Sequence, residues 1–225
     1  MSKFRKRCLI GLVILGWPAS LALAYHLGAY YGFVDTVGAS TSFGRFMGTP
    51  KTEWLDERDM QLLDDFVYID PNQIAWLAPK GSMINGASIP RDLWSWIGSP
   101  FVGKYRNASI VHDVACDQKQ RSHHQVHRMF FDACLAGGVP EPEAKRLYWA
   151  VARYGPRWEL KAMFSVRASP DDEEGTEKTM VIVGKPLPSI KPAVNELQWA
   201  EAYFSDHDPT LEEIEEFSTG ALPHE

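Results

Sequence analysis

The feature that most constrains the fold is a pair of apolar helical stripes joined by a short polar turn, within residues 107–131 and their flanks. The first stripe runs from Gly103 to Cys116. The second begins after Ser122, a residue typical of helix N-caps, and ends at Gly137, a residue typical of helix ends. Because the connection is so short, it favours two neighbouring antiparallel helices. The sequence therefore predicts a helix hairpin.

Chemistry-bearing side chains are concentrated in this hairpin, which holds four of the seven histidines of the chain. When the hairpin register is centred on the turn, His112 of the first helix lies opposite His127 of the second, with Asp113 beside His112. Residues that face one another across antiparallel helices can act together. We therefore expect a catalytic centre at His112, Asp113 and His127.

The same register bears on the cysteines. Cys116 faces His123 or His124, and Cys134 lies roughly 15 Å further along the second helix, beyond the reach of a disulfide bond. We therefore expect Cys116 and Cys134 to remain free and to pack as small apolar residues.

The N-terminal 24 residues predict export. A basic cluster at residues 3–7 precedes an apolar run, and Ala22–Ala24 forms an A-x-A cleavage pattern. The apolar character continues to Val34, so residues 1–24 are either a cleaved signal peptide or an uncleaved membrane anchor. In both cases the body of the chain is expected to be periplasmic or anchored to the inner membrane by this segment.

The rest of the chain divides by composition. Residues 25–52, rich in Gly, Ser and Thr, are expected to be a linker. The acidic residues 169–225 are expected to be a flexible tail, in which residues 195–204 and 211–217 could form short helices. Residues 53–168 are expected to form a globular α+β domain, in which a small antiparallel sheet precedes a three-helix core containing the hairpin. The expected strands cover 66–70, 74–77 and 83–84, and the third helix covers 141–154. With a net charge of −6 and a balanced middle region, the chain has no electrostatic footprint for nucleic acid.

Between the sheet and the hairpin lies the loop NGASIPR, residues 85–91. Gly86 permits backbone conformations that other residues avoid, and Pro90 fixes the exit direction, so the loop holds one shape. Rigidly framed loops often carry functional residues, so Asn85, Ser88 and Arg91 are candidates for substrate binding. The alternative is an ordinary strand-to-helix connection.

The order of these motifs resembles an uncharacterised family of phage, prophage and bacterial proteins, a domain of unknown function. The resemblance covers residues 66–158. Its pattern has a G-A-S-x-P-R loop, an H-D helix, an arginine in the turn, a Gly-Val pair and a closing Tyr-Gly before Trp158. This chain departs from the pattern at Asn85 and His127, where the family usually has aspartates, and at Cys116, where an aromatic residue is common. The resemblance implies a fold and no established activity.

A more remote similarity in layout is to the secreted phospholipases A2. That similarity implies that His112 is a general base acting on water and that Asp113 is a calcium ligand. The carboxylate that orients the histidine in those enzymes is replaced here by His127. The chain also lacks a glycine-rich calcium loop before the helix.

A metal site is a second interpretation of the same residues. His123 and His127 are four residues apart on one helix, and His112 and Asp113 come from the partner helix. These four side chains could hold zinc or a similar divalent ion, whereas the phospholipase-like interpretation implies calcium at Asp113. In the third interpretation these residues have no catalytic or metal-binding role. His112 is then a hydrogen-bonded helix residue, and the other histidines are solvated.

Two classes of function follow. The first is an exported hydrolase that acts on a lipid or cell-wall substrate, with or without a metal. The second is a non-catalytic protein, either an accessory component of phage or prophage type or an interaction partner of a membrane or cell-envelope component. The sequence leaves open whether the chain is an enzyme, and it does not indicate the oligomeric state.

Overall fold

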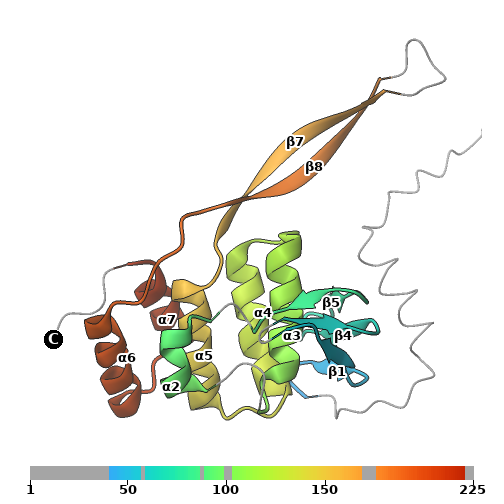
Figure 1. The fold of residues 1–225 in the computed structure, drawn as a ribbon. Coiled ribbons are helices and arrows are strands. Elements are labelled where there is room, and N and C mark those ends of the chain that lie inside the picture. The colour runs from blue at the N-terminus through green and yellow to red at the C-terminus, as the bar shows by residue number, and fades with distance from the viewer. Residues whose placement is uncertain (1–40, 57–58, 87–88, 99–102, 169–175, 221–225) are drawn as a thin grey trace, which may run out of the picture. The chain divides into compact units, whose positions relative to one another are not determined.

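The computed structural model describes residues 41–56, 59–86, 89–98, 103–168 and 176–220. In these ranges the chain is α+β, with small antiparallel sheets followed by helices (Figure 1). The predicted fold class is confirmed. The predicted export segment, residues 1–24, lies outside the described residues, and in the described part of the chain no helix is long and apolar enough to span a bilayer.

One antiparallel sheet has the strand order β1-β4-β5. Its strands are β1 (Arg45–Met47), β4 (Phe66–Ile69) and β5 (Ala75–Ala78). The central strand β4 is almost entirely buried, which fits its run of apolar residues. Asp70 fixes the β4–β5 turn, because its carboxylate accepts hydrogen bonds from the backbone N–H groups of Asn72 and Ile74 and from the indole of Trp76. The predicted strands at 66–70 and 74–77 are therefore present and pair with each other.

The third predicted strand belongs to a different sheet, with the order β2-β3-β6. Its strands are β2 (Thr52–Trp54), β3 (Met60–Leu62) and β6 (Met83–Ile84). Strands β1 and β2 overlap the end of the segment expected to be a linker. Both are three residues long, too short for an alternating pattern to reveal them.

Three helices form the centre of the domain. They are α3 (Arg106–Gln118), α4 (His123–Ala136) and α5 (Glu141–Tyr154), and α4 contacts both of the others. Ser122 caps α4 in a reciprocal capping box with Gln125, and Gly137 ends the helix, as predicted. Helix α3 also packs on β5 and β6, so it connects the hairpin to both sheets.

The short helices η1 (Arg91–Leu93) and α2 (Trp94–Ile97) lead from the loop toward α3. After α5, β7 (Trp158–Ala168) and β8 (Thr176–Pro186) pair as an antiparallel ribbon. Trp158 anchors the start of the ribbon, because it is buried and its indole donates a hydrogen bond to the carbonyl oxygen of Arg121.

The acidic segment contains both of the short helices expected in it, but these helices pack on the domain instead of lying in a flexible tail. It contributes β8 and two helices, α6 (Val194–Asp206) and α7 (Leu211–Thr219). Ala200, Phe204 and Ile214 of these helices are buried in the core. An amphipathic face thus supplies the apolar anchors that the acidic composition obscures.

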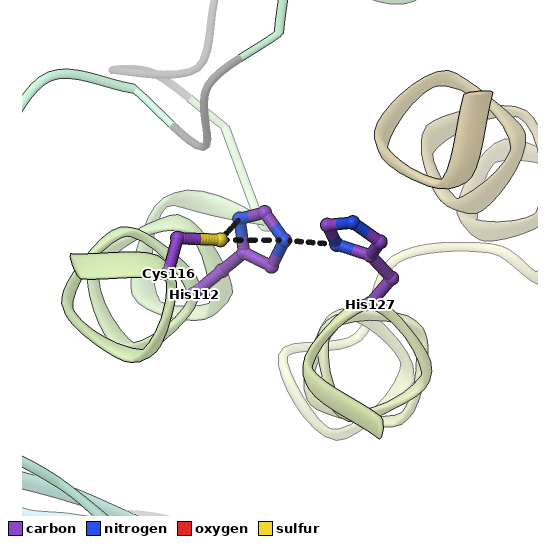
Figure 2. Close-up of side chains that lie close together, drawn as sticks. All are labelled: His112, Cys116 and His127. Atoms are coloured by element: carbon purple, nitrogen blue, oxygen red, sulfur yellow. Dashed lines mark hydrogen bonds between the residues drawn. The ribbon is translucent and has the colours of Figure 1, made fainter. Parts of the chain in front are cut away.

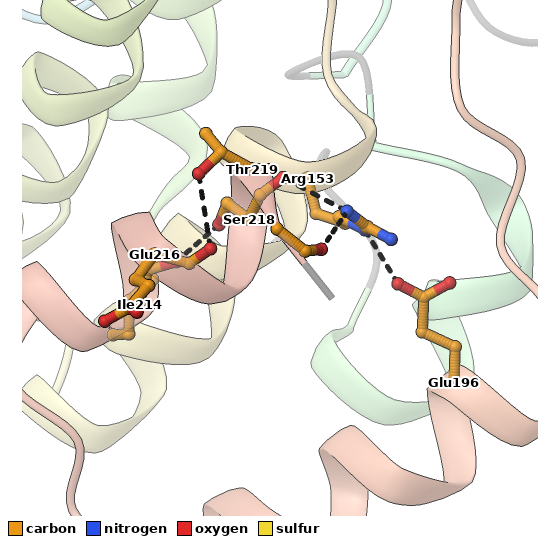
Figure 3. A network of polar contacts seen from close by, with 7 residues as sticks. Arg153, Glu196, Ile214, Glu216, Ser218 and Thr219 are labelled. Atoms are coloured by element: carbon orange, nitrogen blue, oxygen red, sulfur yellow. Dashed lines mark hydrogen bonds and ion pairs between the residues drawn. The ribbon is translucent and has the colours of Figure 1, made fainter. Parts of the chain in front are cut away.

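Cations of α5 neutralise part of the acidic charge. Arg153 donates a hydrogen bond from Nε to Glu196 of α6 at 2.7 Å, and its Nη1 donates to the carbonyl oxygen of Ser218 at the end of α7 (Figure 3). The buried ammonium group of Lys145 lies 2.7 Å from the Asp208 carboxylate, between α6 and α7. These pairs explain how two acidic helices pack against the domain.

Candidate functional site

The candidate site lies where α3 and α4 face each other. His112 Nε2 lies 2.9 Å from His127 Nδ1, and the two rings point toward each other from the two helices (Figure 2). His112 is 0% exposed and His127 is 2% exposed. The predicted register, with His112 opposite His127, is confirmed. The same alignment follows from the short turn between α3 and the Ser122 cap.

Hydrogen bonds assign the proton positions of the pair. His127 Nε2 lies 3.1 Å from the carbonyl oxygen of Pro156, which can only accept, so Nε2 carries the proton in the neutral ring. His127 Nδ1 is then the acceptor, and His112 must donate from Nε2. In the neutral form of His112, Nδ1 then carries no proton. Burial, followed by the neighbouring His112 and His123, lowers the pKa of His127 well below its usual value and keeps the ring neutral.

Cys116 is the third member of the cluster. It lies one turn after His112 on α3, and its Sγ is 3.7 Å from Nε2 and 3.9 Å from Nδ1 of that ring. Burial raises the pKa of the thiol well above its usual value, with Asp113 and Asp117 adding to the effect. The sulfur is therefore a neutral thiol when no metal is bound. Cys116 and Cys134 are both free and buried, as predicted.

Asp113 has a clear partner on the predicted loop. Its Oδ2 accepts hydrogen bonds from the backbone N–H groups of Asn85, at 3.0 Å, and of Gly86, at 2.7 Å. The aspartate thus connects α3 to the start of the NGASIPR loop. Of the three loop residues expected to bind substrate, Asn85 is exposed, Ser88 lies outside the described residues, and the side chain of Arg91 is not described.

His123, the remaining predicted metal ligand, uses Nδ1 to donate a hydrogen bond to the carbonyl oxygen of Trp158 at 2.9 Å. Burial, followed by His124, lowers its pKa. His123 and His127 therefore both form hydrogen bonds to backbone carbonyl groups of the segment that follows α5. The catalytic and metal-binding roles of Asp113 and His123 stay predictions.

Three side chains of types that commonly bind metal ions lie close together in the hairpin. Ligand atoms of His112, Cys116 and His127 all lie within 4.8 Å of one another, and all three residues are buried. Sequence reasoning assigned Cys116 to core packing. The signal that could have found it is its spacing of four residues from His112, which places both side chains on one face of α3.

Comparisons with known proteins match part of the chain to a family model and to two uncharacterized proteins. Residues 60–151 match the family model described as "Protein of unknown function (DUF1353)". The chain is similar to the uncharacterized protein y4jT of Sinorhizobium fredii (strain NBRC 101917 / NGR234), with 39% identity over 164 residues, which are 72% of this chain and 44% of that protein. It is also similar to the uncharacterized protein y4iH of the same strain, with 43% identity over 94 residues, 42% of this chain and 39% of that protein.

The chain therefore spans less than half the length of these two curated relatives. No solved structure matches it. The expected resemblance to an uncharacterised domain family is confirmed.

Proposed function

We propose that the protein, whose residues 60–151 match the DUF1353 family model, is an exported, envelope-associated hydrolase that uses a metal ion held by His112 and His127. The observation that carries this proposal is the 2.9 Å approach of two imidazole nitrogens from neighbouring helices. Facing helices commonly build metal sites in this way. A bound divalent ion would polarise an ester or amide carbonyl and activate a water molecule.

The surroundings of the histidines fit this role. The carbonyl oxygen of Pro156 accepts the Nε2 proton of His127, which directs the Nδ1 lone pair toward His112. Metal-ligating histidines are usually oriented by such a bond from the second nitrogen. For His112 to bind the ion through Nε2, its ring proton would have to shift from Nε2 to Nδ1, so that both histidines would bind as neutral imidazoles.

The substrate class in this proposal is an ester or amide of the cell envelope, in lipid or cell wall. Its support is the basic and apolar pattern of residues 1–24, which is typical of export. Asp113 would act as a positioning residue, because it holds the loop that begins at Asn85 and continues into the predicted substrate-binding residues.

A second function is supported by the burial of the pair. His112 is 0% exposed, and an enclosed histidine that is hydrogen-bonded to a second histidine can hold two helices together without binding a metal. In that case the protein is a non-catalytic accessory component, of phage or prophage type, or an envelope interaction protein. Its histidine pair would then stabilise the fold and bind no metal.

The test compares hydrolysis by the purified full chain with that by His112→Gln and His127→Gln, with and without a chelator. Substrates are chromogenic esters and amides, phospholipid vesicles and purified cell-wall sacculi. His124→Gln is the matched control, because His124 is an exposed neighbour on the same helix. We expect at least a 100-fold loss with chelator or with either buried variant, and no loss in the control.

Equal turnover by all variants would contradict the proposal. Absence of turnover on every substrate, with normal folding and no bound metal, would favour the non-catalytic function.

A further inference from the structure

We infer that Cys116 completes the metal centre, so that His112, His127 and Cys116 together bind a borderline or soft transition-metal ion such as zinc. This inference deepens the proposed function and rests on it, because both assign His112 and His127 as ligands. It adds a thiolate ligand and excludes calcium as the resident ion. The three side chains are shown together in Figure 2.

The distances fit a tetrahedral ion with small adjustments. For Zn–N bonds of about 2.0 Å and a Zn–S bond of about 2.3 Å, tetrahedral angles separate two nitrogens by about 3.3 Å and nitrogen from sulfur by about 3.5 Å. The corresponding separations are 2.9 Å between the imidazole nitrogens and 3.7 Å between Cys116 Sγ and His112 Nε2. The two nitrogens need to separate, and the sulfur to approach His112, by a few tenths of an ångström. The sulfur and the ligand atom of His127 lie within 4.8 Å of each other, so this separation needs to close by at most about 1.3 Å.

The arrangement in sequence also suits a metal. His112 and Cys116 are four residues apart on α3, so one rigid helix sets their separation. His127 comes from α4, and its ring is held by the carbonyl oxygen of Pro156. All three ligands thus stand on elements of the packed core, and three protein ligands leave a fourth position for water or substrate.

The ligand set determines the class of ion. Thiolate and imidazole donors suit zinc or copper, whereas calcium and magnesium require oxygen donors. The nearest predicted oxygen donor, Asp113, uses Oδ2 to bind the backbone at Asn85 and Gly86. Cys116 is therefore a better third ligand than Asp113 or His123, the ligands predicted beside the two histidines.

The experiment uses the full chain in a Cys8→Ser background, so that Cys116 and Cys134 are its two thiols. Because the ligands are buried, cobalt(II) is added during refolding from denaturant. Cobalt is measured per chain after gel filtration, and the near-ultraviolet absorption reports thiolate ligation. The variants are Cys116→Ser and the matched control Cys134→Ser, which alters a buried free cysteine on α4. Circular dichroism checks that each variant folds.

We expect a single tightly bound cobalt ion with a thiolate charge-transfer band in the parent protein and in Cys134→Ser. Cys116→Ser should lose the band and bind cobalt at least tenfold more weakly. A parent protein that folds but binds no cobalt, or a complex without the band, would overturn the inference. Equal binding by the two serine variants would also overturn it.

These outcomes are separable from failure of the proposed function. A cobalt complex with the thiolate band and no hydrolysis of any substrate would remove the hydrolase and leave the metal centre. Metal-dependent hydrolysis that persists in Cys116→Ser and is lost in His112→Gln would remove the thiolate ligand and leave the hydrolase.

Discussion

Deletion of residues 193–225 is expected to lower the melting temperature of the protein by on the order of 10 °C or more. The deletion removes α6 and α7, and with them the buried side chains of Phe204 and Ile214. Truncating one such side chain typically costs about 2–5 kcal/mol, and each kcal/mol shifts the melting temperature of a domain of this size by about 2–4 °C. The deletion also leaves Arg153 without its partner Glu196.

A pair of point variants sharpens this test. Ile214→Ala should lower the free energy of unfolding by about 2–5 kcal/mol, because Ile214 is fully buried. Val194→Ala, at a position that is 74% exposed in α6, should change it by less than about 0.5 kcal/mol. Urea unfolding followed by circular dichroism measures both. If the deletion and Ile214→Ala leave stability unchanged, then α6 and α7 do not pack on the domain.

Gly155→Ala is expected to disturb the histidine centre and to destabilise the fold by about 1–3 kcal/mol. A Cβ atom at this position would lie 2.3 Å from the carbonyl oxygen of Val151 and 3.1 Å from Cε1 of His127. The first contact is with backbone and cannot be relieved by a side-chain rotation. Relief must therefore come from movement of the segment that holds Pro156, the hydrogen-bond partner of His127.

Gly220→Ala is the matched control for this variant. Gly220 follows α7 as Gly155 follows α5, both glycines have negative φ angles, and the nearest atom to an added Cβ at Gly220 is 3.3 Å away. We expect Gly220→Ala to be nearly neutral in urea unfolding and in cobalt binding, whereas Gly155→Ala weakens both. Equal effects of the two variants would show that Gly155 has no special relation to His127.

Local signals explain why the helix hairpin could be predicted. The Ser122 capping box and the stop at Gly137 are both encoded within a few residues. The short turn then fixed the register that brings His112 to His127. Here sequence and structure agree because every determinant is close in the chain.

The third ligand was harder to predict because a cysteine on an apolar stripe has the same pattern as a core residue. Cys116 was assigned to packing, and it is indeed buried. Its proximity to the imidazole of His112 depends on side-chain directions that spacing alone does not fix. The expected oxygen ligand, Asp113, instead bonds to loop backbone far away in the sequence, at Asn85 and Gly86.

The sheets and the acidic helices illustrate two other limits. Strands β1, β2 and β3 have three residues each, which is too few for a periodic signal to mark them. In α6 and α7, a high density of acids suggested a solvated tail, whereas cations on α5 and a few apolar residues anchor the helices. The amino-acid composition alone does not reveal these ion pairs and apolar contacts.

X-ray absorption at the metal edge, measured on the purified full chain, is the most direct test of the metal centre. We predict a bound transition-metal ion with two nitrogen ligands at about 2.0 Å, one sulfur ligand at about 2.3 Å and one further light atom. A shell of oxygen and nitrogen atoms without sulfur would contradict the role of Cys116. A correctly folded chain that retains no transition metal would contradict the centre formed by His112, His127 and Cys116 altogether.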